Sequence, residues 1–168
     1  METYVDTLSI LAEVTTAFVA LAAIVASLRI TLGQKLDPFQ KLLVHFFVEV
    51  GMLNVSITLL ALVLLGFALD ESTVARYVTL YALATSCAYL VHYIRRRIRI
   101  KAPTPLPSML VMIGYAAWLP LLALSALGVF WDPSLPIVAA FCYWALFTVV
   151  VIFISFLATF VDIDQTLP

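Results

Sequence analysis

The chain has 168 residues and a formal net charge of −1, and 64% of the residues are hydrophobic while only 11% are charged. Soluble globular domains contain roughly 45–50% apolar and about 25% charged residues, so an ordinary soluble fold is excluded. Several apolar stretches reach the roughly 20 residues that an α-helix needs to cross a bilayer, whereas a transmembrane β-barrel would show short alternating segments. We therefore expect an all-α, polytopic transmembrane bundle of five spans that forms one integral membrane domain over residues 1–168.

The first predicted span, residues 4–30, carries one ionisable side chain well inside it, Glu13. Ionisable groups inside a span are costly and usually face a bundle interior or water. Glu13 shares a helical face with small and polar residues, which are Ser9, Thr16, Ala17, Ala20 and Ser27. Two interpretations are open: this face is a close helix–helix contact through small residues, or it lines a pore or cavity with Glu13 near the outer mouth.

The second predicted span, residues 38–69, is expected to be the central helix of the bundle. Its start is marked by Asp37 as an N-cap and by Pro38 at the first helical position. The stretch is apolar enough to cross a membrane, yet it carries polar side chains on two faces. We therefore expect protein or water on both sides of this helix.

His45 and Glu49 lie four residues apart in this span, so they share one helix face. Ser56 extends the same face, whereas Asn54 lies on the opposite one. One interpretation is a hydrogen-bond network that joins helices. The alternative is an ion-binding or proton-relaying site.

The third predicted span covers residues 72–98, with Ser72 expected to cap its start. His92 lies near its end, beside a strongly basic run at residues 95–101. Such a run is typical of an anchor that fixes topology and contacts anionic lipid headgroups. His92 is expected at about the depth of His45, which enters from the same side of the membrane.

His45, Glu49 and His92 can therefore share one layer of the bundle. Two histidines and a carboxylate are weak candidates for a divalent metal site. Two histidines on separate helices can also ligate a haem iron. Spacing across separate helices is weak support for either group, so the sequence predicts no bound cofactor.

The fourth and fifth predicted spans, residues 106–130 and 135–161, contain no Asp, Glu, Lys, Arg or His. We expect them to form an outer, lipid-facing layer around the first three spans. The cysteines Cys87 and Cys142 both fall inside apolar stretches, which predicts two free, buried thiols.

Eight of the nine Lys and Arg residues flank the first and third connections, namely Arg29, Lys35, Lys41, Arg95, Arg96, Arg97, Arg99 and Lys101. Positively charged connections stay in the cytoplasm. This rule predicts an outside N-terminus and a cytoplasmic C-terminus in a plasma membrane, such as a bacterial inner membrane.

The sequence contains no hydrolytic triad, no phosphate-binding Gly-rich loop, no zinc-ligand motif and no nucleic-acid-binding surface, so we do not expect an enzyme. The leading hypothesis is a small homo-oligomeric channel or ion-translocating protein for cations or protons, because five helices are too few to enclose a wide pore alone. The expected pathway residues are Glu13, His45, Glu49, Asn54, Ser56 and His92. The alternatives are a non-catalytic structural or accessory subunit of a larger membrane complex, and a metal- or haem-containing redox protein.

Overall fold

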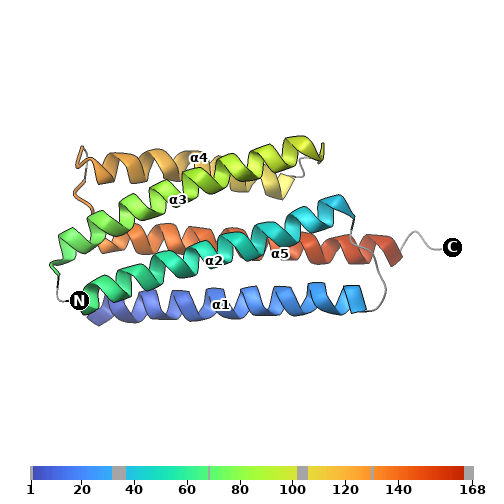
Figure 1. The fold of residues 1–168 in the computed structure, drawn as a ribbon, viewed down its shortest axis with the longest axis horizontal. Coiled ribbons are helices and arrows are strands. Elements are labelled where there is room, and N and C mark those ends of the chain that lie inside the picture. Colours follow the sequence, from blue (N-terminus) through green and yellow to red (C-terminus); the bar gives the residue numbers. More distant parts are fainter. Residues whose placement is uncertain (1, 32–36, 68, 102–105, 130, 165–168) are drawn as a thin grey trace.

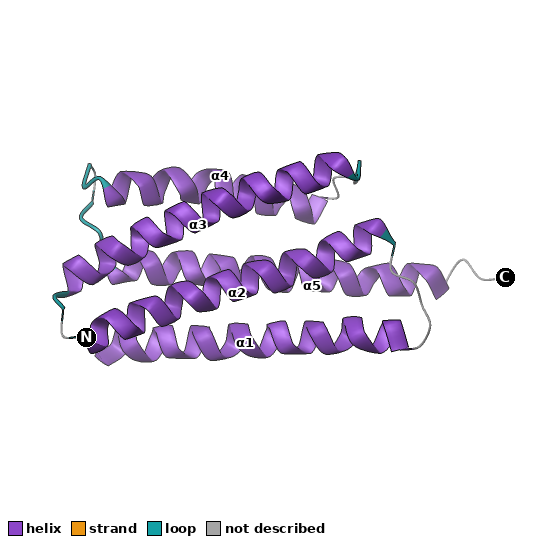
Figure 2. Ribbon diagram, viewed as in Figure 1, coloured by secondary structure: helices purple, strands orange, loops and turns teal. Residues whose placement is uncertain are grey.

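The computed structural model describes residues 2–31, 37–67, 69–101, 106–129 and 131–164, and all of its regular structure is α-helical (Figures 1 and 2). The helices are α1 (Glu2–Thr31), α2 (Pro38–Gly66), α3 (Glu71–Arg99), α4 (Leu106–Ala126) and α5 (Leu135–Asp164). All five are long and apolar enough to cross a membrane. The predicted all-α architecture with five spans is confirmed, and the chain is an integral, multi-pass membrane protein.

Successive helices run in opposite directions, so the two ends of the bundle differ in charge (Figure 1). One end holds the start of α1 and the α2–α3 and α4–α5 connections; we call it the acidic end. It carries Asp6, Asp70, Glu71 and Asp132, together with Arg76. The opposite, basic end carries Lys41, Arg95, Arg96, Arg97, Arg99 and Lys101, together with Asp37, and α5 ends there with Asp162 and Asp164. Lys35, which was counted with this end, lies outside the described residues.

The centre of the bundle is shared by α2 and α5. Helix α5 contacts all four other helices, and α2 contacts α1, α3 and α5. The ring of Phe47 on α2 packs against those of Phe153 and Phe156 on α5, with centroids 5.9 and 5.7 Å apart. The prediction that α5 belongs to a lipid-facing layer is therefore wrong, because its Phe141, Phe153 and Phe156 side chains are buried in the interior. Among the described residues, helix α4 contacts only α3 and α5 and lies at the periphery, as expected.

Two helices begin with carboxylate caps. At α2, Asp37 accepts a hydrogen bond from the Gln40 backbone N–H at 2.6 Å, which confirms the predicted N-cap. At α3 the cap is Asp70 rather than the predicted Ser72, because the Asp70 carboxylate accepts from the Thr73 N–H at 2.9 Å. Ser72 instead donates its hydroxyl to Asp70 at 2.6 Å. These hydrogen bonds, that of Ser72 foremost, lower the pKa of Asp70 from 3.8 to about 2.

Helix α4 ends earlier than predicted because of Gly128. Residue 130, the predicted end, lies outside the described residues, but α4 already ends at Ala126. Gly128 has a φ of 65°, and its N–H donates to the Ser125 carbonyl at 2.9 Å. The Val129 N–H donates to the Leu124 carbonyl at 3.1 Å. This pair of bonds is the Schellman arrangement, which favours glycine at the left-handed position.

The two cysteines differ in their surroundings. Both are free thiols, as predicted. Cys142 is buried on α5, whereas Cys87 is exposed on α3. The predicted burial is therefore correct for Cys142 and wrong for Cys87, because an apolar stretch does not distinguish a face turned to lipid from one turned to protein.

Candidate functional site

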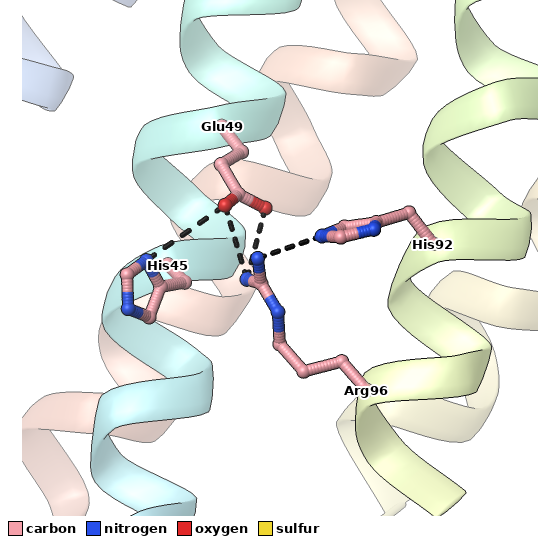
Figure 3. Close-up of polar contacts among 4 residues, drawn as sticks. All are labelled: His45, Glu49, His92 and Arg96. Carbon is pink, nitrogen blue, oxygen red and sulfur yellow. Dashed lines mark hydrogen bonds and ion pairs between the residues drawn. The ribbon is translucent and has the colours of Figure 1, made fainter. Parts of the chain in front are cut away.

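Four polar side chains meet between α2 and α3 (Figure 3). His45 and Glu49 come from α2, and His92 and Arg96 come from α3; we call these residues the charged cluster. Arg96 Nη1 donates to both Glu49 carboxylate oxygens, at 3.0 and 3.2 Å. Each helix contributes a pair at i and i+4, so two pairs of side chains face one another across the interface.

The lengths of the two helices explain why Arg96 reaches Glu49. Glu49 lies eleven residues after Pro38, which is roughly 16 Å along the axis of α2. Arg96 lies in the last turn of α3. Helical side chains point back toward the N-terminus of their own helix. The long arginine side chain therefore extends from the basic end toward the middle of the bundle.

The contact between Arg96 and His92 fixes the proton on the histidine. Arg96 Nη2 lies 2.8 Å from His92 Nε2. A guanidinium group has five N–H donors and no acceptor, so His92 Nε2 must accept and the ring proton must lie on Nδ1. His92 is therefore neutral in this arrangement. A proton added at Nε2 would break the bond and place a second cation beside Arg96.

The charged cluster is open on the outer surface of the protomer. His45 is 60% exposed, while Glu49 and Arg96 are 32% and 28% exposed. His45 Nδ1 lies 3.7 Å from Glu49 Oε1, which is too long for a hydrogen bond and close enough for an ion pair when the ring is charged. Lys41, one helical turn further toward the basic end, is also exposed. Charged groups thus occupy a face that the other described helices cover only in part.

Polar groups continue along this face toward the acidic end. Tyr81 on α3 donates its hydroxyl to Ser56 on α2 at 3.3 Å. Ser56 in turn donates to the Leu53 carbonyl at 2.7 Å. Ser56 therefore lies on the same side of α2 as His45 and Glu49, as the sequence predicts, and one hydrogen bond joins it to α3.

Asn54 lies in a different place, in the interior where α1, α2 and α5 meet. Its side chain is fully buried. Asn54 Nδ2 donates to Thr15 Oγ1 on α1 and to the Cys142 carbonyl on α5, both at 3.1 Å. The residue therefore joins three helices and takes no part in the charged cluster.

Glu13 lies on the uncovered face of α1. It is exposed, whereas Thr15, two residues later, is fully buried. Two residues turn a helix by about 200°, so Glu13 points away from the side on which Thr15 meets Asn54. Helix α1 does not contact α3 within the described part of the chain. One protomer therefore does not bring Glu13 together with Glu49 and His92.

Arg96 is the member of the site that sequence reasoning missed. Its i, i+4 spacing from His92 repeats the spacing of His45 and Glu49, but the basic run around it was interpreted as a membrane anchor. In the structure its guanidinium lies between Glu49 and His92, where a metal ion shared by them would lie (Figure 3). Among the described residues, no three His, Cys, Asp or Glu side chains are arranged to hold a metal ion.

Comparison of this chain with protein-family models, with curated proteins and with solved structures found no match.

Proposed function

We propose that the chain is a small homo-oligomeric membrane protein that translocates protons or cations past the charged cluster. One observation carries the proposal: the Glu49–Arg96 pair is joined to His92 on a face that the chain's own described helices leave partly uncovered. Ionisable groups within spans commonly belong to ion pathways and proton relays.

The exposure of charged side chains within a membrane span supports a homo-oligomer. A charged residue at the centre of a membrane helix costs about 2.5–3.5 kcal/mol on insertion scales. His45 is exposed and Glu49 is partly exposed in the single chain, so lipid contact at this depth is unfavourable. A second copy of the chain, or water held between copies, removes this cost and encloses a polar route that one protomer lacks.

The geometry suggests how a proton controls such a route. His92 Nε2 accepts either the Arg96 hydrogen bond or a proton, and not both. Histidine is the side chain that ordinarily changes charge between pH 5 and 8. A proton on His92 repels Arg96, and Glu49 is then the remaining partner of Arg96 in the cluster. His45, 3.7 Å from Glu49, supplies a second group that can accept the next proton.

The test is ion flux through purified protein in liposomes, driven by a pH or cation gradient. We expect Glu49→Gln and His92→Gln to lower flux roughly tenfold or more, because both belong to the route. Lys41→Gln is the matched control, since Lys41 is exposed one turn away and makes no described contact with the cluster. The proposal fails if the wild-type protein carries no proton or common cation, or if Glu49→Gln leaves flux and selectivity unchanged.

A second candidate is a non-catalytic accessory subunit of a larger membrane complex. The observation that favours it is Asn54, whose bonds to Thr15 and the Cys142 carbonyl join helices in the interior, away from the charged cluster. In this case Glu49 and Arg96 are also helix-joining groups. Co-purification with other subunits at fixed stoichiometry, without flux in liposomes, would favour this candidate over the first.

A further inference from the structure

A second polar feature lies at the acidic end, far from the basic end that the charged cluster faces. A surface cavity of about 670 Å³ opens between α4, the α4–α5 connection and the start of α5. Its wall is formed by Trp118, Leu121, Trp131, Asp132, Ser134 and Ile137. Small-molecule sites have volumes of roughly 300–1,000 Å³ and apolar or aromatic walls with a few polar groups.

The cavity follows from the way the chain leaves α4. The turn at Gly128 ends the helix and brings the connection back, so that Asp132 Oδ1 lies 3.9 Å from where a Gly128 Cβ would lie. The Ser134 carbonyl accepts the Ile137 N–H at 3.1 Å and so starts α5. These two backbone features fix the wall that carries Trp131, Asp132 and Ser134.

The opposite wall is held by aromatic packing. The Trp118 indole on α4 meets the buried Phe141 ring on α5 edge to face, with centroids 5.9 Å apart and planes at 67°. Leu121 lies nearly one turn further along α4 and is 38% exposed. The cavity therefore has two indoles and two aliphatic side chains around one carboxylate.

The charges in and around the cavity favour a cation. No described residue forms an ion pair or hydrogen bond with the Asp132 carboxylate. The acidic end also carries Asp6, Asp70 and Glu71, with Arg76 as its basic residue. Such a field attracts positive ligands, and the faces of tryptophan rings bind ammonium groups, especially alkylated ones.

The apolar wall selects among cations. Calcium prefers six to eight oxygen ligands, and magnesium keeps several waters. Here one carboxylate and one serine are surrounded by indole and aliphatic groups. We propose that this cavity binds an alkylated ammonium group, with Trp118 and Trp131 against its methyl groups and Asp132 opposing its charge. This proposal is independent of ion translocation at the charged cluster.

The experiment uses the full chain in a detergent without ammonium headgroups, with Trp144→Phe to leave Trp118 and Trp131 as the only tryptophans. Tetramethylammonium chloride is titrated against tryptophan fluorescence at constant ionic strength. We expect saturable binding, and Asp132→Asn should weaken it roughly tenfold or more. Asp6→Asn is the matched control, because Asp6 lies at the same end but outside the cavity. This variant should bind tetramethylammonium almost as well as the Trp144→Phe protein does.

Two further probes keep the result interpretable. The alcohol 3,3-dimethylbutan-1-ol has the shape of choline without its charge, and it should bind much more weakly than choline. Trp131→Phe should retain part of the binding that Trp131→Leu loses, which separates loss of the ring from loss of the fold. The proposal is overturned if binding is not saturable, if the neutral alcohol binds as well as choline, or if Asp132→Asn binds like the parent.

The same chemistry occurs in free alkylammonium ions and in phosphatidylcholine headgroups. Reconstitution into phosphatidylglycerol or phosphatidylcholine vesicles distinguishes them. A tetramethylammonium response that disappears only in phosphatidylcholine indicates a headgroup occupant. An equal response in both lipids indicates a free ligand, and either result supports an ammonium site. Absence of a response in both lipids contradicts the proposal.

Discussion

The Arg96 guanidinium on α3 holds both carboxylate oxygens of Glu49 on α2, at 3.0 and 3.2 Å. This ion pair joins α2 to α3. The pair is partly exposed, so its contribution in water would be modest, but within a span each partner depends on the other for neutralisation.

The first prediction is that Glu49 and Arg96 are energetically coupled. We expect Glu49→Gln and Arg96→Gln each to lower the free energy of unfolding by about 1–3 kcal/mol, because each leaves one charge in a membrane span without its partner. The double variant should lose less than the sum of the two. Unfolding in mixed detergent–SDS micelles measures this cycle, and additive losses would show that the pair contributes nothing. Lys41→Gln should be close to neutral.

The second prediction concerns Asn54, which joins α1, α2 and α5 through two hydrogen bonds. Side-chain hydrogen bonds between membrane helices contribute about 0.6 kcal/mol each on average and at most about 1.7. Asn54→Ala should therefore cost about 1–2 kcal/mol in the same unfolding assay. Ser155→Ala is the control, since its partly buried hydroxyl donates to the Val151 carbonyl within its own helix. Equal losses for both variants would contradict the assignment of Asn54 as a helix-joining residue.

The sequence predicted most of what depends on local signals. The five spans follow from apolar length, and the Asp37–Pro38 start of α2 follows from capping preferences. The cap of α3 was placed two residues late, because Ser72 and Asp70 both fit the N-cap pattern and only the structure shows which side chain accepts the Thr73 N–H.

The sequence did not predict which helix faces are buried. Inside a membrane, lipid and protein interior are equally apolar, so periodicity does not separate them. For this reason α5 was assigned to the outer layer although Phe141 and Phe156 are fully buried. The partner of Glu49 was missed for a related reason: Arg96 belongs to a basic run, and the sequence does not show which face of α3 packs against α2.

The third prediction rests on the close approach of α1 and α2 at Gly51. A Cβ added there would overlap the Val19 side chain, which is β-branched and therefore stiff. Gly51→Ala should destabilise the bundle by about 1–3 kcal/mol through overpacking. Adding Val19→Ala should restore much of the loss, because it removes the methyl group that the new Cβ meets. Gly66→Ala is the control, since no atom lies within 4 Å of its added Cβ, and a loss there as large as at Gly51 would rule out the steric explanation.

The fourth prediction is a pH dependence that arises at Asp70. Its pKa is lowered from 3.8 to about 2 in the folded chain, so its carboxylate stabilises the fold above pH 3.8, and this contribution is lost as the pH falls toward 2. Ser72→Ala removes the largest cause and should raise the pKa of Asp70. Carboxyl NMR titration measures this directly. The Glu71→Gln variant, altered at the neighbouring carboxylate, should leave the Asp70 titration in place, and a titration of Asp70 near 3.8 in the wild-type protein would refute the capping geometry.

The last prediction concerns the uncovered face of α1 that carries Glu13. An exposed carboxylate roughly 14 Å along the helix from Tyr4 lies deep within a span. If copies of the chain cover this face, a cysteine placed on it meets its counterpart. In a background without Cys87 and Cys142, Ala20→Cys should form disulfide-linked dimers in native membranes on mild oxidation, since Ala20 is exposed on the same face as Glu13.

Ala22→Cys is the matched control for this cross-linking, because Ala22 lies two residues later on α1 and is fully buried. It should remain monomeric under the same oxidation. Glu13→Gln, which keeps the size and the hydrogen-bonding capacity of the side chain, should preserve the Ala20→Cys dimer. Dimers formed equally from both cysteine positions would indicate random collision, and their absence from Ala20→Cys would exclude α1 as the face at which copies meet.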